Sequence, residues 1–255
     1  MVQKSSLNAQ EIENFSKDSS QWWDTAGPFA PLHRLNPTRM KYIRDQILAH
    51  YERTNTIDGN IAVNKAPLKG FSILDIGCGG GLVCESLSRM GAKTTGLDAD
   101  SNAIAVAQDH ANQSALKIEY QAMTSEAYLA SNKKTFDVVC ALEIIEHVDH
   151  PDFFIETALE LLKPGGLLIL STLNRTVKSA LLGVFVAEYV LNWVPKGTHT
   201  HSKFVKPSEL AAMLRVHGAD TIDVTGLKLD PLSNEFVLSK NDLAVNYFLC
   251  AKKPS

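Results

Sequence analysis

Long apolar runs are missing from this chain. No segment reaches the roughly 20 consecutive apolar residues that a helix needs to cross a bilayer. The first residues also lack the apolar stretch of a secretory signal peptide. They carry Glu11, Glu13 and Asp18 and hold no arginine before Arg34, which argues against an organelle transit peptide. We therefore expect a cytoplasmic protein.

Cysteine is scarce, and so is any excess of one charge. The four cysteines form neither a C-x-x-C pair nor a zinc-binding spacing. Four reduced thiols are typical of a protein from a reducing compartment. The formal net charge is −3, so no overall positive field favours nucleic acid, and we expect no nucleic-acid partner.

What the chain does have is length and a regular alternation of strand and helix patterns. Its 255 residues, 45% of them hydrophobic, can bury the core of a single domain. Over 70–255 the alternation predicts an α/β fold, a doubly wound, mostly parallel, seven-stranded sheet. The predicted strands are 72–76, 93–97, 117–120, 136–141, 167–172, 220–224 and 246–251. The predicted helices are 80–90, 101–113, 151–162 and 207–217.

The first 69 residues are expected to form a helical cap and a linker in front of this core. One helix is predicted near Ala9–Asp18. A second is predicted over Pro37–Arg53, because proline is favoured in the first turn of a helix. The polar stretch Asn55–Leu68 is interpreted as the connection to the first strand.

The segment Ile73–Gly81 is the most informative motif. It predicts a buried strand, a glycine turn and the start of a helix, and Asp98 follows the next apolar stretch. Glycines let a nucleotide-like ligand approach the backbone, and a carboxylate about 20 residues later can accept hydrogen bonds from a ribose. A dinucleotide fingerprint needs a small residue where Leu82 stands. The pattern D-x-G-x-G-x-G instead resembles the first motif of the class I S-adenosylmethionine (SAM) methyltransferases, which makes SAM the expected cofactor.

Eight residues are expected to hold this cofactor. They are Asp75, Gly77, Gly79, Gly81, Asp98, Met123, Leu142 and Arg39. Asp75 is placed to tie down the amides of the turn, and Leu142 follows the fourth strand, where it can face the amino acid part of the cofactor. Met123 follows the third strand, where this fold contacts adenine, although a methionine there can equally belong to the core. Arg39 can pair with the methionyl carboxylate, but on sequence alone a solvated helix arginine is the plainer interpretation.

A carboxylate and histidine cluster follows the fourth predicted strand. On a helical turn, Glu143, Glu146 and His147 lie at i, i+3 and i+4, which puts them on one face. Such a set can bind a hard divalent cation or act as a general base in a methyl transfer to a phenol. The alternative is a structural role, in which the pair Glu146-His147 orients the loop.

An apolar insertion at about 175–200 interrupts the alternation after the fifth strand. Its core, Ala180–Val194, is too short to cross a bilayer, and lysines and an arginine flank it. An apolar segment with basic edges is typical of helices that lie on an anionic membrane surface. A buried helix and a homo-oligomer contact are the alternatives. We expect Lys178–Val194 to be the membrane contact.

Several further motifs resemble those of the ubiquinone-biosynthesis O-methyltransferases. K-P-G-G at 163–166 is shared by many methyltransferases. The more restricted motifs are W-W-D at 22–24, N-P-T-R at 36–39, S-T-L-N-R at 171–175 and P-K-G-T-H at 195–199. The resemblance covers roughly residues 12–250.

The resemblance implies a SAM-dependent methylation of phenolic hydroxyls on polyprenylated catechol-type intermediates, namely 2-polyprenyl-6-hydroxyphenol and 3-demethylubiquinol. It implies that Glu143, Glu146 and His147 bind Mg²⁺ or another divalent cation. It also implies a protein peripheral on the inner face of a bacterial cytoplasmic membrane, with a ubiquinone-biosynthesis complex as a partner. Two other interpretations stay open: a methyltransferase for a different hydrophobic small molecule, and a membrane-bound assembly subunit without catalysis.

Overall fold

The structure is a computed structural model that describes residues 16, 18–53, 66–131, 134–179, 203–230 and 232–255. Its strands are β1 (Ser72–Ile76), β2 (Lys93–Asp98), β3 (Glu119–Ala122), β4 (Phe136–Leu142), β5 (Leu162–Leu173), β6 (Asp220–Asp230), β7 (Glu235–Ser239) and β8 (Asn246–Lys252). Its helices are η1 (Ser19–Gln21), α2 (Ala30–Arg53), α3 (Leu82–Arg89), α4 (Ser101–Gln113), α5 (Ser125–Ser131), η3 (Ile145–His147), α6 (Pro151–Glu160) and α8 (Pro207–Val216).

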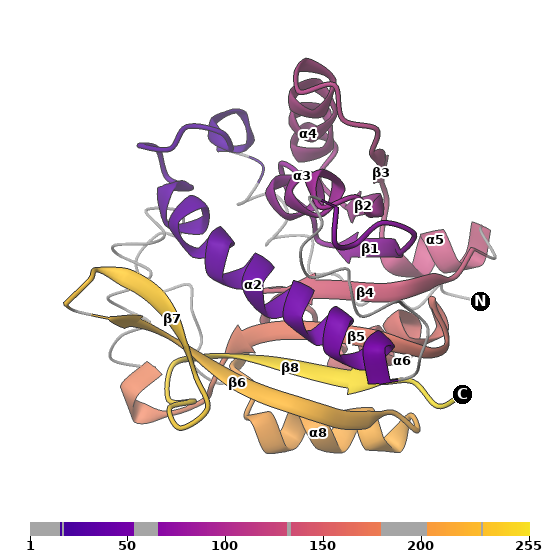
Figure 1. The fold of residues 1–255 in the computed structure, drawn as a ribbon, viewed down its shortest axis with the longest axis vertical. Helices are drawn as coiled ribbons and strands as arrows, with labels where there is room; N and C mark the ends of the chain where they lie inside the picture. Colours follow the sequence, from indigo (N-terminus) through magenta and orange to yellow (C-terminus); the bar gives the residue numbers. More distant parts are fainter. Residues whose placement is uncertain (1–15, 17, 54–65, 132–133, 180–202, 231) are drawn as a thin grey trace.

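The strands form one sheet in the order β3-β2-β1-β4-β5-β8-β6-β7 (Figure 1). Strands β1 to β5 are parallel, and β8 runs antiparallel to both of its neighbours. The predicted doubly wound, mostly parallel α/β sheet is therefore confirmed. Because β8 runs the other way, its first residue, Asn246, pairs with Leu173 at the edge where the parallel strands end.

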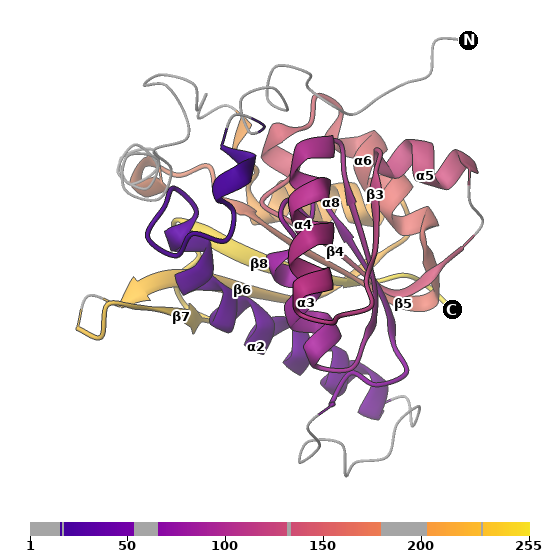
Figure 2. The ribbon, with the colours of Figure 1, turned by 90° about the horizontal axis from the view of Figure 1, so that it is seen from above.

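Helices cover both faces of this sheet. Successive side chains of a strand point to opposite faces, so Ile73 and Val138 pack in one apolar cluster while Leu74 and Val139 pack in another. The first cluster contains residues of α2 and α3, and the second contains residues of α6 and α8. Figure 2 shows α2 on one side of the sheet and α5 and α6 on the other. The core thus lies in two layers, one on each side of the strands.

The sheet has eight strands where seven are predicted. The extra strand is β7, which pairs with a continuation of β6 beyond its predicted end at residue 224. The sequence pattern does not indicate this continuation, because Gly226 lies within it and a glycine weakens a strand pattern. A Cβ at Gly226 would lie 1.7 Å from the carbonyl oxygen of Asp242, so a side chain has no room there. Helix α5 is also unpredicted, since a helix this short has too few turns to show a period.

Helix α2 begins at Ala30, not at Pro37 as predicted, and Pro37 lies inside it. Proline has no N–H to donate to the carbonyl four residues earlier, which normally disfavours this position. The first turn of the helix is stabilised here by hydrogen bonds and by a buried side chain. The carbonyl of Phe29 accepts from the amides of Leu32 and His33, and the Phe29 side chain is buried. Tertiary packing therefore extends the helix by seven residues, and α2 crosses one face of the sheet in Figure 1.

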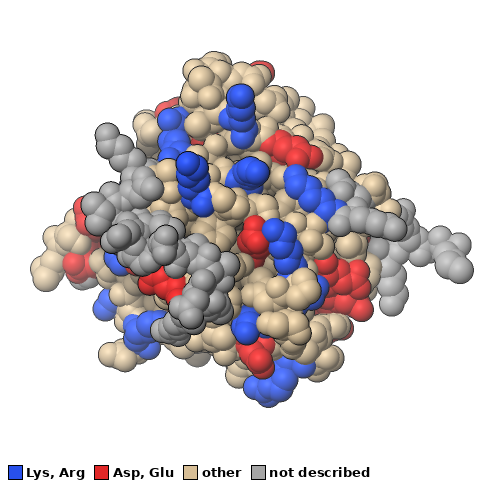
Figure 3. All heavy atoms as spheres, turned by 45° about the vertical axis from the view of Figure 1, so that its right-hand side comes forward, with Lys and Arg blue, Asp and Glu red and all other residues tan. Residues whose placement is uncertain are grey.

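Three predicted segments lie wholly or mostly outside the described residues. They are the helix near 9–18, the connection at 55–68 and most of the insertion at 175–200. None of the described helices combines the length and the apolar character needed to cross a bilayer. On the face drawn in Figure 3, Lys and Arg side chains lie interspersed with Asp and Glu over the described part.

Candidate active site

The turn after β1 needs glycine at several positions. Gly77, Gly79 and Gly81 have φ values of 74°, 51° and 87°, a region that side chains disfavour. There is also little room for a side chain at these positions. A Cβ at Gly79 would lie 2.3 Å from the indole ring of Trp22, and one at Gly81 would lie 2.3 Å from the hydroxyl oxygen of Tyr120. The predicted glycine turn is thus present at the carboxyl edge of the sheet.

Asp98, at the end of β2, holds this turn in place. Its Oδ2 accepts a hydrogen bond from the amide of Gly79 at 2.8 Å, and its Oδ1 accepts from the amide of Asp100 at 2.9 Å. Asp75 was expected to tie down the turn amides, but its Oδ2 lies 3.5 Å from the thiol of Cys84, which donates to it. Burial raises the pKa of Asp75 to about 7 and also raises the pKa of Asp98.

Aromatic residues of the N-terminal segment pack against the same turn. The Trp22 ring lies beside Gly79 and stacks on Phe29 with 3.9 Å between ring centroids. Trp23 donates from Nε1 to the carbonyl oxygen of Gly80 at 3.0 Å. The sequence marks this stretch only as aromatic and irregular, so its contact with the turn is a feature that sequence reasoning missed.

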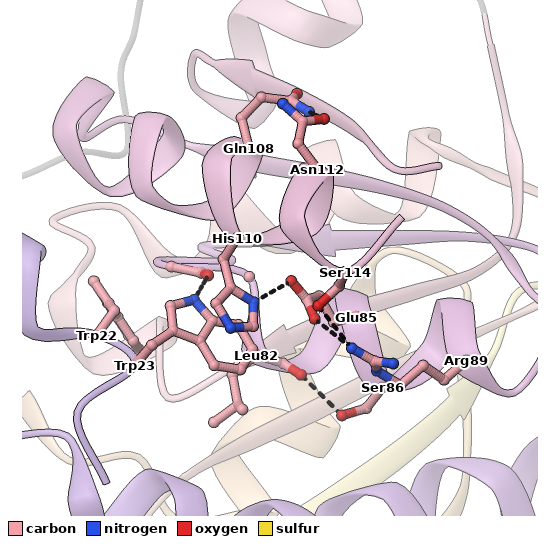
Figure 4. A network of polar contacts seen from close by, with 12 residues as sticks. Trp22, Trp23, Leu82, Glu85, Ser86, Arg89, Gln108, His110, Asn112 and Ser114 are labelled. Carbon is pink, nitrogen blue, oxygen red and sulfur yellow. Dashed lines mark hydrogen bonds and ion pairs between the residues drawn. The ribbon is translucent and has the colours of Figure 1, made fainter. Parts of the chain in front are cut away.

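A polar network anchors Trp23 to the two helices beyond the turn (Figure 4). The ring of Trp23 stacks on His110 of α4, with centroids 3.4 Å apart and planes 5° apart. His110 Nδ1 lies 2.6 Å from Oε1 of Glu85, and Arg89 donates to Oε2 of Glu85 at 3.2 Å. Segments from the cap, α3 and α4 therefore meet around the glycine turn.

Arg39 projects from α2 into the interior and is buried. Its Nε and Nη2 atoms are inaccessible to solvent and have no hydrogen-bond partner among the described residues. Nη2 lies 3.9 Å from Oε1 of Glu143, too far for a hydrogen bond. Burial lowers the pKa of Arg39, whereas the nearby Glu143, Asp75 and Glu146 raise it. The predicted Arg39 is therefore an interior cation with two donor atoms unused.

Glu143 follows β4 directly and has an unusual backbone conformation. Its φ of 56° lies in the left-handed region, which a residue with a side chain adopts only when its surroundings require it. Its Oε1 accepts from the hydroxyl of Ser171 at 2.7 Å and from Nδ2 of Asn246 at 3.0 Å. Strands β5 and β8 thus hold the Glu143 side chain in place.

Glu146 is buried and close enough to Glu143 for their charges to interact. Its Oε2 accepts from the hydroxyl of Thr172 at 2.7 Å. Burial, followed by the charge of Glu143, raises the pKa of Glu146 to about 7, and His147 opposes that shift. A carboxylate with this pKa gains and loses a proton near neutral pH, as a general base does.

The prediction that Glu143, Glu146 and His147 share one face of a helical turn is wrong. The left-handed Glu143 lies outside the helical turn, and η3 covers only Ile145–His147. Among the described residues, no three His, Cys, Asp or Glu side chains gather as a metal-binding group. One oxygen of each glutamate accepts a hydrogen bond from a hydroxyl of β5. The part of the chain that the structure describes thus shows no preformed three-ligand cation site.

The remaining predicted contacts lie at the same edge of the sheet. Met123 directly follows β3 and is partly buried against the core on one face. Leu142 is the last residue of β4 and is buried in the cluster on the opposite face. A Cβ at Gly77 would lie 2.2 Å from the side chain of Ile144, so the glycine turn and the loop after β4 are in contact.

The structure therefore brings together Arg39, Asp75 and the two glutamates around the ends of β1 and β4. Sequence reasoning missed the residues that position the glutamates. They are Ser171, Thr172 and Asn246. The two hydroxyl residues had a usable signal, because they are polar residues near the carboxyl end of an apolar parallel strand.

Solved structures share this fold. The plantazolicin methyltransferase BamL, in complex with a triazolic desmethylPZN analog and SAH, superposes with a TM-score of 0.64 at 15% identity over 96% of this chain and 99% of that chain. Magnesium protoporphyrin IX methyltransferase of Synechocystis PCC 6803 with bound SAH gives 0.58 at 17% identity, over 96% and 95%. A family model described as a methyltransferase domain matches residues 34–224. The strand order, the glycine turn and the acid at the end of β2 define a class I SAM-dependent methyltransferase.

Curated relatives narrow this class. The ubiquinone biosynthesis O-methyltransferase of Sinorhizobium medicae is 43% identical over 251 residues, which cover 98% of each chain. The protein of the same name from Chelativorans sp. is 44% identical over 254 residues, 100% of this chain and 97% of the relative. This chain belongs to the ubiquinone biosynthesis O-methyltransferase family.

Proposed function

We propose that this protein methylates phenolic hydroxyls of polyprenylated catechol-type intermediates, namely 2-polyprenyl-6-hydroxyphenol and 3-demethylubiquinol. The observation that carries the proposal is the near-full-length match to relatives named for ubiquinone biosynthesis. The buried carboxylates and the buried arginine at the carboxyl edge of the sheet support it, since they suit a site that binds a charged cofactor and takes up a proton.

Bound SAM supplies an electrophilic methyl group on a sulfonium. In this proposal the unused donors of Arg39 bind its carboxylate, which would satisfy the Nε and Nη2 atoms. The glycine turn lets the backbone approach the nucleoside, and Asp98, already bonded to the turn, accepts hydrogen bonds from the ribose. Met123 and Leu142 lie at the strand ends that complete this pocket.

Glu146 is the proposed proton acceptor. A phenol is a weak nucleophile until its proton leaves, and a carboxylate with a pKa of about 7 can take that proton at neutral pH. Thr172 fixes the orientation of Glu146. Glu143 raises the pKa of Glu146, and His147 lowers it. In this proposal the substrate hydroxyl passes its proton to a Glu146 oxygen, and the phenol oxygen gains the methyl group as the methyl–sulfur bond of SAM breaks to leave SAH.

The role of a divalent cation, Mg²⁺ or another, is a separate part of this proposal. The test is an assay of the purified protein with SAM and a demethylated quinol, with and without a chelator. Methyl transfer that is insensitive to chelator supports the carboxylate mechanism, and transfer that needs Mg²⁺ assigns the cation a role. Absence of methyl transfer under both conditions would contradict the proposed function.

We further propose that the protein is peripheral on the inner face of a bacterial cytoplasmic membrane and contacts anionic lipid through Lys178–Val194. A substrate with a polyprenyl tail resides in the bilayer, which gives such a contact a purpose. Residues 180–202 lie outside the described part of the chain. A ubiquinone-biosynthesis complex is the proposed protein partner.

Liposome flotation tests the membrane contact. Vesicles with anionic lipid are expected to carry the protein upward, and neutral vesicles are expected to carry much less. Deletion of 178–194 should abolish flotation, while SAH binding by calorimetry reports whether the deleted protein is folded. Undiminished flotation of a folded deletion variant would place the membrane contact elsewhere.

A further inference from the structure

Asn246 has a buried acceptor atom with no partner. Its Oδ1 is inaccessible to solvent and has no hydrogen bond among the described residues. The orientation of the amide is fixed by its other atom, because Nδ2 donates to Oε1 of Glu143 at 3.0 Å and only the nitrogen can donate to a carboxylate. The unused atom is therefore an amide carbonyl beside the proposed reaction centre.

Asn246 lies on the far side of β4 from the glycine turn. Asn246 begins β8, which is separated from β4 by β5, whereas the glycine turn follows β1 on the other side of β4. The backbone around Asn246 is held firmly, since Asn174 donates from its amide to the carbonyl of Val245 and from its side chain to that of Leu243. Oδ1 therefore lies away from the turn that is proposed to hold the cofactor, on the part of the sheet beyond β4.

A buried amide carbonyl without a partner destabilises a structure, because it has lost its hydrogen bonds to water without gaining others. A hydrogen-bond donor on the bound substrate would remove that cost. The proposed substrates carry two neighbouring hydroxyls, of which one is methylated and the other keeps its proton. The ring hydroxyl that stays unmethylated is a donor of the required kind.

We propose that Oδ1 of Asn246 accepts a hydrogen bond from the hydroxyl that is not methylated, and that Asn246 thereby selects catechols over phenols with a single hydroxyl. This inference rests on the proposed function. It assigns Asn246 two contacts at once: Nδ2 holds Glu143, and Oδ1 binds the substrate.

The test compares two probes and two variants. The probes are a catechol with a short isoprenoid tail and the same phenol without the second hydroxyl. Asn246→Ala removes both the donor to Glu143 and the free acceptor, whereas Ser171→Ala removes only a donor to the same Glu143 oxygen. We expect Asn246→Ala to lower the catechol-to-phenol ratio of kcat/KM roughly ten- to hundred-fold. Ser171→Ala should slow both probes and keep the ratio.

Each other outcome is also decisive. An unchanged ratio in Asn246→Ala, or no preference in the wild type, overturns the inference and leaves the proposed function standing. Weakened SAH binding in Asn246→Ala would identify a cofactor contact and also overturns it. If the variant turns over too slowly, the dissociation constants of the two phenols in the presence of SAH give the same ratio. A wild type that methylates neither probe removes the proposed function, and this inference with it.

Discussion

The buried guanidinium of Arg39 is the residue on which cofactor binding is expected to depend most. Two of its donor atoms are desolvated and unpaired, so the bound carboxylate would gain charge-assisted hydrogen bonds without further desolvation of the arginine. We expect Arg39→Met to weaken SAH binding roughly ten- to hundred-fold in calorimetry.

Arg34→Met is the matched control for that experiment. Arg34 lies on the same helix but donates to Asn234 at an exposed site. It should leave SAH affinity unchanged. Equal affinities of the Arg39 variant and the wild type would show that the carboxylate is bound elsewhere.

The raised pKa of Glu146 predicts that the rate of methyl transfer depends on pH. Its pKa is raised to about 7, so below that pH the side chain is protonated and cannot accept the substrate proton. The kcat/KM of the wild type is expected to rise through pH 7 and then level off. Glu146→Gln should lose this rise and slow methyl transfer by a factor of about 10²–10⁴.

An exposed glutamate provides the comparison for Glu146. Glu156 lies on the solvent side of α6, and Glu156→Gln should keep both the rate and the pH profile. A profile that is the same in Glu146→Gln and in the wild type would assign the ionisation to another group.

The positions of many single residues were predictable, and their partners were not. The motif after β1 identified the glycines and Asp98 because a turn with positive φ leaves a glycine pattern in the sequence. The same motif assigned the turn amides to Asp75, whereas Asp98 binds the amide of Gly79. The choice between two nearby carboxylates depends on distances across strands, which a linear pattern does not contain.

At the scale of elements, the glycine turn at the start of α3 is the most constrained. An alanine at Gly81 would have an unfavourable positive φ and would also contact the Tyr120 hydroxyl. Gly218 has a similar φ of 79° with open space around it. Gly218→Ala should therefore cost only the backbone term of roughly 1–2 kcal/mol. Gly81→Ala should cost at least about 1 kcal/mol more in urea unfolding, and equal losses would mean that the turn relaxes freely.

Helix α2 shows how an element can depart from its local signals. Proline usually marks the start of a helix, yet the residues before Pro37 are helical because the Phe29 carbonyl and the buried Phe29 ring support the first turn. The extension matters for the site, since Asn36, on the turn that contains Pro37, donates to Ser86 of α3. The helix that carries Arg39 is thus fixed against the helix that follows the glycine turn.

For the whole molecule, the buried carboxylates make stability depend on pH. The pKa of Asp75 rises on folding from 3.8 to about 7, so the folded protein holds this proton more tightly than the unfolded chain. Its contribution to stability therefore falls as pH rises between these values. The free energy of unfolding of Asp75→Asn minus that of the wild type should therefore increase by roughly 2–3 kcal/mol from pH 5 to pH 8 in ligand-free urea unfolding. A difference that is constant with pH would show that Asp75 is ionised throughout.

The sequence by itself determined the α/β class, the cofactor turn and the family, because these depend on local patterns: glycine spacing, strand alternation and restricted motifs. Only the tertiary structure decided which groups meet at the carboxyl edge of the sheet. Ser171, Thr172 and Asn246 reach the two glutamates across strands that are distant in the chain, and Trp22 reaches the glycine turn from the cap. Such contacts depend on sheet order and on the direction of β8, which no local pattern encodes.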